Sequence, residues 1–230
     1  MKVYCINLER RPDRRKKVED EFRREGMNSV EFFKATDGCS HPRMNKGECG
    51  CTDSHIRVWR DIVANNYEWA LVFEDDARLV ENFSEKLDEI VALLPEGWDY
   101  VNLGRVPGHF IRDRHFSHNL FSKGSSTTTH AYLISQKGAR QISLWNTLDV
   151  QFIVDMQIAR TPLNMYFTEA PLATQNIAGQ PLLGFFKSMF DGDLGIIRKS
   201  FDMDFGFRTQ WPTYIYFLLV LSVCYAMQRS

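Results

Sequence analysis

An abrupt change from apolar to acidic residues restricts the possible folds of this chain more than any other feature of its sequence. Trp69 to Phe73 is a continuous apolar run of strand length, and Glu74-Asp75-Asp76 follow it directly. A central strand of a parallel sheet shows this pattern where it reaches its carboxyl end. Because α/β folds bind ligands at that edge of the sheet, the three acids are expected to lie at a binding site.

Strands and helices are predicted to alternate along the chain. Short apolar runs predict strands, and apolar residues at spacings of three and four predict helices. The predicted strands are 3–6, 30–33, 69–73, 100–103, 131–134 and, as the last one, 165–167; the predicted helices are 12–26, 48–66, 87–94, 136–144 and 149–160. Residues 105–129 show no clear period and are expected to form a long loop. This order indicates an α/β fold with a mostly parallel, doubly wound sheet and flanking helices.

Length and charge narrow the class of protein. The 230 residues fit one folded domain with an appendage, and the formal net charge of -1 argues against a nucleic-acid-binding protein. Six basic residues lie between Arg10 and Lys17. They form a solvated helix face, or the first of them flank a phosphate site.

The cysteines are too few and too irregularly spaced for a four-ligand metal site. Cys5, Cys39, Cys49, Cys51 and Cys224 are odd in number and have no CxxC spacing, so neither a zinc ribbon nor a complete disulfide framework is indicated. The N-terminal residues lack the apolar core and cleavage site of a signal peptide. We therefore expect a cytoplasmic protein, or one associated with a membrane through its other end.

The C-terminal end is expected to differ from the rest of the chain. The sequence divides into a catalytic domain at 1–180, an extension at 181–208 and a hydrophobic helix at 209–228. The 20 uncharged residues of that helix, at a rise of about 1.5 Å each, are long enough to cross roughly 30 Å of hydrocarbon. The segment is thus a candidate membrane anchor, or alternatively a buried or oligomer-forming helix.

Three consecutive acids at a strand end need a positive partner, because like charges at short range raise one another's pKa. A hard divalent cation such as Mn²⁺ or Mg²⁺ is the simplest such partner, since it binds carboxylates together with substrate phosphates. Bound there, it would neutralise a diphosphate leaving group. The alternative is an acidic turn or helix start without a ligand.

Several further segments, in order along the chain, resemble glycosyltransferase family 25, which includes bacterial lipooligosaccharide galactosyltransferases and procollagen galactosyltransferases. The main ones are Ile6 to Arg14, Gly47 to His55 and Leu71 to Ala77. Smaller matches are Leu103-Gly104-Arg105, Ala131 to Ala139, Val154-Asp155 and Pro171 to Gln175. No one motif is decisive, but together they span about three quarters of the chain, from Val3 to Gln175.

This resemblance implies a GT-A-like fold, a UDP-sugar donor such as UDP-galactose, a requirement for Mn²⁺ or Mg²⁺, and inversion at the anomeric carbon. By matching positions, Asp76 would bind the metal, and Glu74 and Asp75 would serve the metal or the donor ribose, with Glu74 as the second metal ligand and Asp75 as the substrate contact. Asn7, Arg10, Arg11, Gly104 and Arg105 would contact the substrate. Asp155 would be the general base or an acceptor contact, since an inverting enzyme needs a base near the acceptor hydroxyl. The alternative for Asp155 is a helix-capping or pairing role.

Ser54 and His55 invite comparison with a nucleophile and its base. Adjacent residues on a helix point in directions about 100° apart, so the two side chains are not expected to bond to each other. They are instead predicted to contact or support the substrate, with a structural histidine as the alternative. His130, just before a predicted strand, is a further candidate to approach the same site.

The predicted function is transfer of a hexose, galactose or glucose, from a UDP-sugar to a hydroxyl of a glycan or hydroxylated protein acceptor. The chain lacks the signal sequence and the usual ending of the family's animal members, which leaves the acceptor open. The alternative from another class is a catalytically silent binding or adhesion module that keeps the same scaffold, since fold does not fix function.

Overall fold

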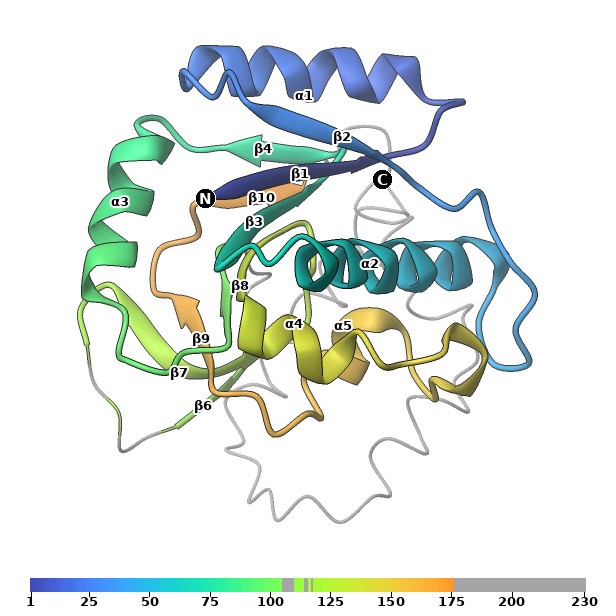
Figure 1. Cartoon of the computed structure of the whole chain (residues 1–230). Coiled ribbons are helices and arrows are strands. Elements are labelled where there is room, and N and C mark those ends of the chain that lie inside the picture. The colour runs from blue at the N-terminus through green and yellow to red at the C-terminus, as the bar shows by residue number, and fades with distance from the viewer. Residues whose placement is uncertain (105–109, 114–115, 117, 176–230) are drawn as a thin grey trace, which may run out of the picture. The chain divides into compact units, whose positions relative to one another are not determined.

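A large mixed sheet with helices on both faces forms the part of the chain that the computed structural model describes, residues 1–104, 110–113, 116 and 118–175 (Figure 1). The sheet strands are β1 Lys2–Asn7, β2 Val30–Lys34, β3 Trp69–Glu74, β5 Tyr100–Asn102, β6 Phe110–Arg112, β7 Phe121–Ser126, β8 Ala131–Ser135 and β9 Met165–Thr168. The helices are α1 Pro12–Arg24, α2 Lys46–Ala64, α3 Phe83–Leu93, α4 Gln136–Ile142 and α5 Val154–Ile158. A small second sheet pairs β4 Ala77–Leu79 with β10 Ala173–Gln175.

The strand order is β2-β1-β3-β8-β5-β9-β7-β6, and most of the strands run in one direction. Strand β1 is parallel to β2 and β3, and β5 is parallel to β9. Strands β8 and β7 run the other way. The chain returns from β5 to β8 without a crossover helix, which a parallel pair would need. The predicted α/β class with its large, mostly parallel sheet is confirmed, and the reversal of the central strand β8 is a feature that the sequence did not indicate.

Three smaller predictions are wrong. The expected loop at 105–129 contains β6 and β7, which pair as antiparallel neighbours. The expected helix at 149–160 is a 3₁₀ turn, Thr147–Asp149, followed by the short α5. Val150, Val154 and Ile158 are all buried and are spaced four residues apart, which is the pattern of a helix. The backbone at Val150 is extended, so no continuous helix forms there. The strand at 165–167 is not the last one, because β10 follows it.

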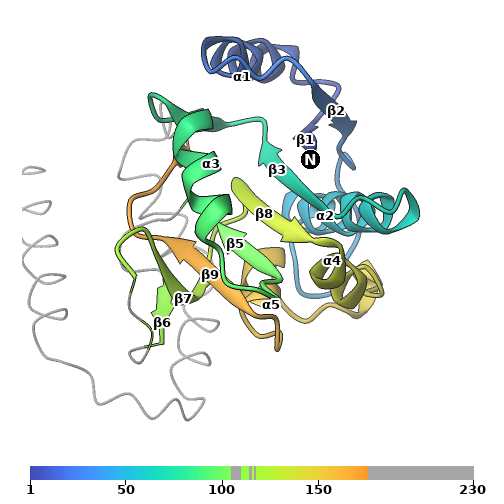
Figure 2. The same cartoon turned by 60° about the vertical axis from the view of Figure 1, so that its left-hand side comes forward.

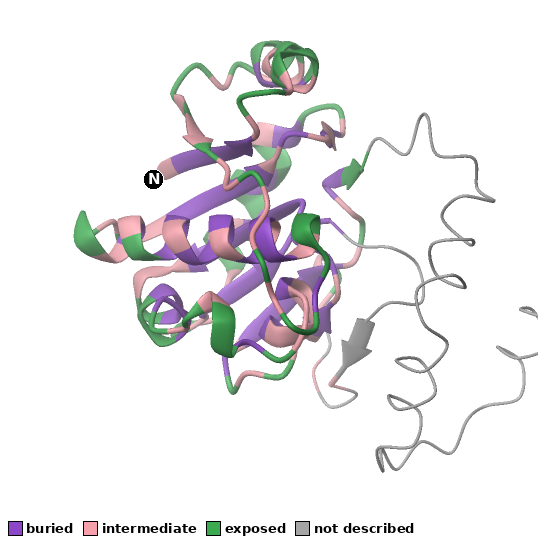
Figure 3. Ribbon diagram, turned by 90° about the vertical axis from the view of Figure 1, so that its right-hand side faces the viewer, coloured by how far each residue is buried: buried purple, intermediate pink, exposed green. Residues whose placement is uncertain are grey.

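Alternating residues of the sheet bury their side chains in two separate cores, as the period of a strand requires. One core packs Val3, Leu71 and Val101 against α1 and α3. The other packs Tyr4, Val72 and neighbouring residues against α2, α4 and α5. Figure 2 shows α3 on one side of the strands and α2 and α4 on the other, and Figure 3 shows the buried strands between half-buried helices. The sheet is therefore covered on both faces.

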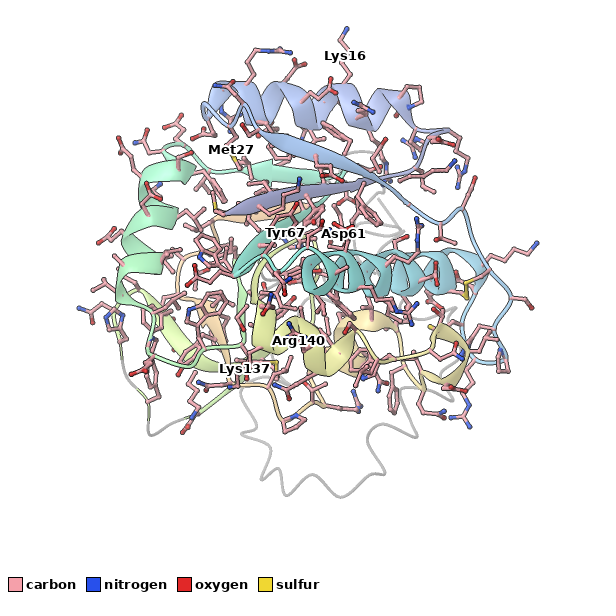
Figure 4. All side chains as sticks on the ribbon, viewed as in Figure 1. Lys16, Met27, Asp61, Tyr67, Lys137 and Arg140 are labelled. Atoms are coloured by element: carbon pink, nitrogen blue, oxygen red, sulfur yellow. A yellow bond between two sulfur atoms is a disulfide. The ribbon has the colours of Figure 1, made fainter. Side chains whose placement is uncertain are left out.

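Polar contacts fix α2 against the first strand. The Tyr4 hydroxyl donates a hydrogen bond to Asp61 Oδ2 over 2.5 Å, and the Tyr4 ring packs edge-on against Tyr67; Figure 4 labels Asp61 and Tyr67 between β1 and α2. At its other end, α2 begins with a capping box in which Asn45 and Glu48 exchange side-chain and backbone hydrogen bonds. Helix α2 is thus held at both ends, and its buried face is fixed relative to the sheet.

A disulfide between Cys39 and Cys49, which the sequence did not single out, ties the segment before α2 to its first turn. The same turn packs tightly, since a Cβ at Gly50 would meet the carbonyl oxygen of Thr36 at 2.5 Å. Cys5 and Cys51 are free thiols.

The chain divides into two units, Met1–Asn176 and Ile177–Ser230, and the second lies outside the described residues. The predicted extension at 181–208 and the predicted hydrophobic helix at 209–228 fall in that part. None of the helices among the described residues is both long and apolar enough to span a bilayer.

Candidate active site

The three acids at the end of β3 point in different directions and have different partners. Glu74 is the last residue of β3, and its carboxylate lies on the side of α2. Asp75 points to the opposite side, toward α1, as alternation along a strand requires. Asp76 lies in the turn that follows. The three carboxylates are therefore close in sequence but lie in three different surroundings.

Asp75 is buried and firmly held. Asn7, at the end of β1, donates from Nδ2 to Asp75 Oδ2 over 2.8 Å, and Arg14 of α1 donates from Nη1 to Asp75 Oδ1 over 3.0 Å. Each oxygen of the carboxylate thus has a partner, and the charge is paired with a guanidinium. The two predicted substrate contacts, Asn7 and Asp75, are brought together, but they bind each other.

Glu74 lies between β8 and α2. Its Oε1 accepts a hydrogen bond of 2.6 Å from the Thr129 hydroxyl and lies 3.5 Å from His55 Nε2. Burial alone would raise the pKa of Glu74, but the nearby His55 imidazole and the Thr129 hydroxyl outweigh it and hold the pKa at about 2. Glu74 is thus ionised throughout the physiological range.

Asp76 has the least satisfied carboxylate of the three. Its Oδ1 is buried and has no hydrogen-bond partner among the described residues, while Oδ2 lies 3.6 Å from Arg14 Nη1. Burial raises the pKa of Asp76 to about 7, and the negative charges of Glu74 and Asp75 add to this effect against the opposing charge of Arg14. A buried, unpaired carboxylate oxygen is costly, and a proton, a water molecule or a cation at Oδ1 would each relieve this cost.

A divalent cation fits this arrangement. Glu74 and Asp76, the predicted metal ligands, carry carboxylate oxygens at one sheet edge, and the buried Asp76 Oδ1 is open to a bond. Oxygen ligands of this kind are those that Mg²⁺ and Mn²⁺ prefer. The donor atoms are thus of the chemical type that suits the predicted metal, and Asn7 and Arg14 hold the turn in place through Asp75.

His55 is fully buried and is oriented from both sides. Its Nδ1 lies 2.9 Å from the Tyr132 hydroxyl, which also accepts a hydrogen bond from Trp59 Nε1 over 2.9 Å. Its Nε2 points toward Glu74. The predicted neighbour Ser54 does something else: its hydroxyl donates to the Gly50 carbonyl and accepts from the Thr36 backbone N–H. Ser54 thus supports the start of α2, while His55 reaches the acids.

Asp155 lies in the first turn of α5 and is half-buried. Its Oδ1 accepts a hydrogen bond of 2.6 Å from the backbone N–H of Met156. Burial raises the pKa of Asp155, the charge of Glu74 adds to this, and His55 opposes it. The charges of Glu74 and His55 therefore act on the Asp155 carboxyl group. Its hydrogen bond to the Met156 backbone is also the contact expected of an acid that only stabilises the start of a helix.

Gly104 follows β5 at the same edge of the sheet, where the His130 ring packs against it. A Cβ at Gly104 would lie 1.9 Å from His130 Nε2, so the position admits no side chain without a shift of that ring. His130 Nε2 also lies 3.2 Å from the Ala173 carbonyl oxygen. Gly104 thus makes room for His130, which does approach the site; Arg105 lies outside the described residues.

The other predicted arginines pair with acids outside the triplet, although the backbone carbonyl of Arg11 accepts a hydrogen bond from Asn7 Nδ2. Arg10 pairs with Asp37 and Arg11 with Asp13, all with substantially exposed side chains. Lys16 projects from α1 away from the sheet (Figure 4). The basic cluster is mainly a solvated helix face, except that Arg14 turns inward to the acids.

Arg14, Thr129 and Cys51 join this site without having been predicted. Thr129 precedes β8, and its place beside Glu74 follows from the reversed direction of that strand, which puts the start of β8 next to the end of β3. The run Thr127-Thr128-Thr129-His130 is the signal that could have indicated this, had β8 been expected to run antiparallel.

The carboxylates lie at the carboxyl end of a central strand of a sheet that is covered by helices on both faces, which is the edge where α/β proteins bind their ligands. The chain belongs to glycosyltransferase family 25: the family model described as "Glycosyltransferase family 25 (LPS biosynthesis protein)" matches residues 1–158.

Curated relatives agree with this family. The chain is 35% identical over 166 residues to a "Glycosyltransferase 25 family member" of Aedes aegypti, covering 61% of this chain and 27% of that protein. It is 27% identical over 230 residues to "Procollagen galactosyltransferase 1" of Danio rerio, covering 86% of this chain and 38% of the relative. It is also 28% identical over 214 residues to "Inactive glycosyltransferase 25 family member 3" of Mus musculus, covering 79% and 36%. The chain thus spans well under half of these relatives, some of which are named as inactive.

Proposed function

We propose that this chain is an inverting glycosyltransferase that moves a hexose, galactose or glucose, from a UDP-sugar to a hydroxyl of a glycan or hydroxylated protein acceptor, with Mn²⁺ or Mg²⁺ as cofactor. Family membership supports glycosyl transfer in general. The observation that carries the metal-dependent form is the buried, unpartnered Asp76 Oδ1 beside the ionised Glu74 at the end of β3.

Glu74 and Asp76 would hold the cation, which supplies positive charge to the diphosphate of the leaving nucleotide. Asn7 and Arg14 fix Asp75, and through it the turn that presents Asp76. His55 and Thr129 fix Glu74 from the other side. A site whose charged groups are held before the substrate arrives needs little rearrangement during the reaction.

Asp155 is our proposed base for the acceptor hydroxyl. Its raised pKa makes its carboxylate a stronger base than an exposed aspartate, which favours proton removal near neutral pH. The proton of the acceptor hydroxyl would pass to Asp155 as that oxygen bonds to the anomeric carbon, and UDP would leave from the opposite face.

The test is the release of UDP from UDP-galactose and UDP-glucose by the full chain, with and without Mn²⁺. Asp76→Asn should abolish the metal-dependent release while leaving the far-ultraviolet circular dichroism spectrum unchanged. Asp88→Asn, at an exposed acid of α3, is the matched control and should retain full activity. An active Asp76→Asn protein with unaltered metal dependence would refute the proposal.

A second candidate function is a catalytically silent binding module, which the inactive relatives favour. Calorimetric titration with UDP in the presence of Mn²⁺ separates the two. Metal-dependent UDP binding together with UDP release supports the enzyme. Binding without release from any UDP-sugar, even with candidate acceptors present, supports the silent module.

Association with a membrane through 209–228 also stays a proposal. It is tested by comparing how the full chain and a chain ending at Arg208 sediment with phospholipid vesicles. Vesicle binding by the full chain alone would support an anchor, and equal behaviour of the two chains would contradict it.

A further inference from the structure

A thiol, an imidazole and a carboxylate, each able to bind a metal ion, lie close together beside the proposed active site. Cys51 and His55 are one turn apart on α2, so they lie on the same face of the helix, and Glu74 approaches them from β3. One ligand atom from each residue lies within 4.8 Å of the other two. His55 Nε2 and Glu74 Oε1 are 3.5 Å apart.

The His55 ring gives a second, independent sign of a ligand. Its side chain is fully buried, and Nε2 makes no hydrogen bond in the part of the chain that the structure describes, where Glu74 Oε1 faces it at 3.5 Å. Its Nδ1 lies at hydrogen-bond distance from the Tyr132 hydroxyl. Metal-binding histidines show this arrangement, with one nitrogen held by a neighbouring polar group and the other directed at the metal.

The donor set distinguishes among metals. A thiolate, an imidazole and a carboxylate suit Zn²⁺, whereas Mg²⁺ and Mn²⁺ prefer oxygen ligands alone. Zn–N bonds of about 2.0–2.1 Å and Zn–O bonds of about 2.0–2.2 Å place the ligand atoms of a tetrahedral ion about 3.4 Å apart. The separation of 3.5 Å between His55 Nε2 and Glu74 Oε1 matches that geometry.

We infer that Cys51, His55 and Glu74 form a binding site for zinc, or for another thiophilic divalent ion, distinct from the proposed oxygen-ligand site at Glu74 and Asp76. The ion would displace the thiol proton of Cys51 into solvent and keep its fourth position for water or another ligand. Because Glu74 is common to both sites, zinc would withdraw it from the Mn²⁺ or Mg²⁺ site and inhibit transfer. That last consequence rests on the proposed function, whereas zinc binding itself does not.

Cobalt is the probe, because Co²⁺ substitutes for Zn²⁺ and reports its ligands by absorption. The full chain, freed of metal and kept without reductant so that Cys39–Cys49 stays oxidised, should show a thiolate-to-cobalt charge-transfer band that added Zn²⁺ removes. Loss of an outer-shell partner typically weakens a metal site about 10–100-fold, so Cys51→Ser, which removes a direct ligand, should weaken cobalt binding at least about 10-fold. Cys5→Ala, at the other free thiol of the described residues, should leave the band unchanged, and so should Cys224→Ser, at a cysteine outside the described residues.

If Cys51→Ser fails to fold, a measurement on the wild-type protein still tests the zinc site. Zn²⁺ should protect Cys51 from iodoacetamide, as mapped by mass spectrometry, and EDTA should restore labelling. A wild-type protein without the cobalt band, or equal labelling of Cys51 with and without Zn²⁺, overturns the inference.

The two proposals can fail separately. Asp76→Asn should keep the cobalt band while losing Mn²⁺-dependent release of UDP. Normal UDP release without a cobalt band refutes the zinc site alone. A cobalt band without UDP release from any donor refutes the proposed transfer alone.

Discussion

Asn7 and Asp75, 68 residues apart in the sequence, are joined by a buried hydrogen bond in which Asn7 Nδ2 donates to Asp75 Oδ2 over 2.8 Å. The bond links the carboxyl ends of two neighbouring parallel strands, β1 and β3. Arg14 completes the contact by pairing with the other oxygen of Asp75. The turn that presents Asp76 is therefore anchored to the first strand and the first helix.

This contact predicts that Asn7→Ala destabilises the protein. Removal of the amide leaves a buried carboxylate oxygen without its donor, which should lower the free energy of unfolding by about 1–3 kcal/mol. Urea unfolding followed by circular dichroism measures the change. Asn28→Ala, at an exposed asparagine after α1, is the matched control and should change stability little. Equal stability of the two variants would show that the bond does not hold the turn.

Asp76 predicts a dependence of stability on pH. Its pKa is raised from the usual 3.8 to about 7, mainly by burial. A carboxyl group whose pKa is higher in the folded state favours folding only while it is protonated, so this contribution is lost as the pH rises from about 4 to about 7. Asp76→Asn, which cannot ionise, should therefore gain stability relative to wild type over that window, reaching roughly 2–4 kcal/mol above pH 7.

Chemical denaturation of both proteins at a series of pH values, without divalent metal, measures this difference. Asp88→Asn, at an exposed acid, should show no such trend. A stability difference between wild type and Asp76→Asn that is flat from pH 4 to 8 would contradict the burial and charge assigned to Asp76.

Gly104 predicts a steric effect. In Gly104→Ala the new Cβ would fall 1.9 Å from His130 Nε2, so the ring must move, and such overpacking typically costs about 1–3 kcal/mol. Thermal unfolding should show a lower Tm for this variant. Gly47→Ala, whose Cβ would meet nothing nearer than Asn45 Oδ1 at 3.3 Å, is the control. Adding His130→Ala to Gly104→Ala should remove part of the loss, and no recovery would argue against this contact.

The Cys39–Cys49 disulfide predicts a stability that depends on redox conditions. It closes a loop with a sequence separation of 10, for which restriction of the unfolded chain contributes about 2–3 kcal/mol. A reductant should lower the Tm of the wild-type protein to that of a Cys39→Ser, Cys49→Ser double variant, whose own Tm should be unaffected. Mass spectrometry shows whether the reductant has broken the bond. If the bond is broken and the Tm of the wild-type protein is unchanged, the expectation is wrong.

Local patterns were enough to predict most elements of this fold. The helices at Pro12 and near Glu48 and the strand ending at Glu74 are found close to their expected bounds, because each combines a clear period with a clear start or stop signal. The reversal of β8 was not predictable in this way. Strand periodicity is the same in both directions, and direction depends on how distant segments pair.

The same limit explains which site residues were found. Glu74, Asp76 and His55 stand out by residue type and by their place after a strand or on a helix face. Arg14 and Thr129 do not, since one lies among six basic residues and the other among three threonines. Their roles follow only from long-range pairing of α1 and β8 with the end of β3.

Strand β8 has a consequence for how the protein folds. Its partners β3 and β5 precede it by many residues, and its central pairs, such as Leu71 with Leu133, join positions far apart in the sequence. Contacts of such high contact order form late, because the long intervening segment must first be closed. Thr129 and the backbone of His130, which bond to Glu74 in the folded protein, are expected to reach it only at that step. A nascent chain released or cleaved before β8 would therefore carry Glu74 without the Thr129 hydroxyl that orients its carboxylate, so we expect the full metal site only when the sheet is complete.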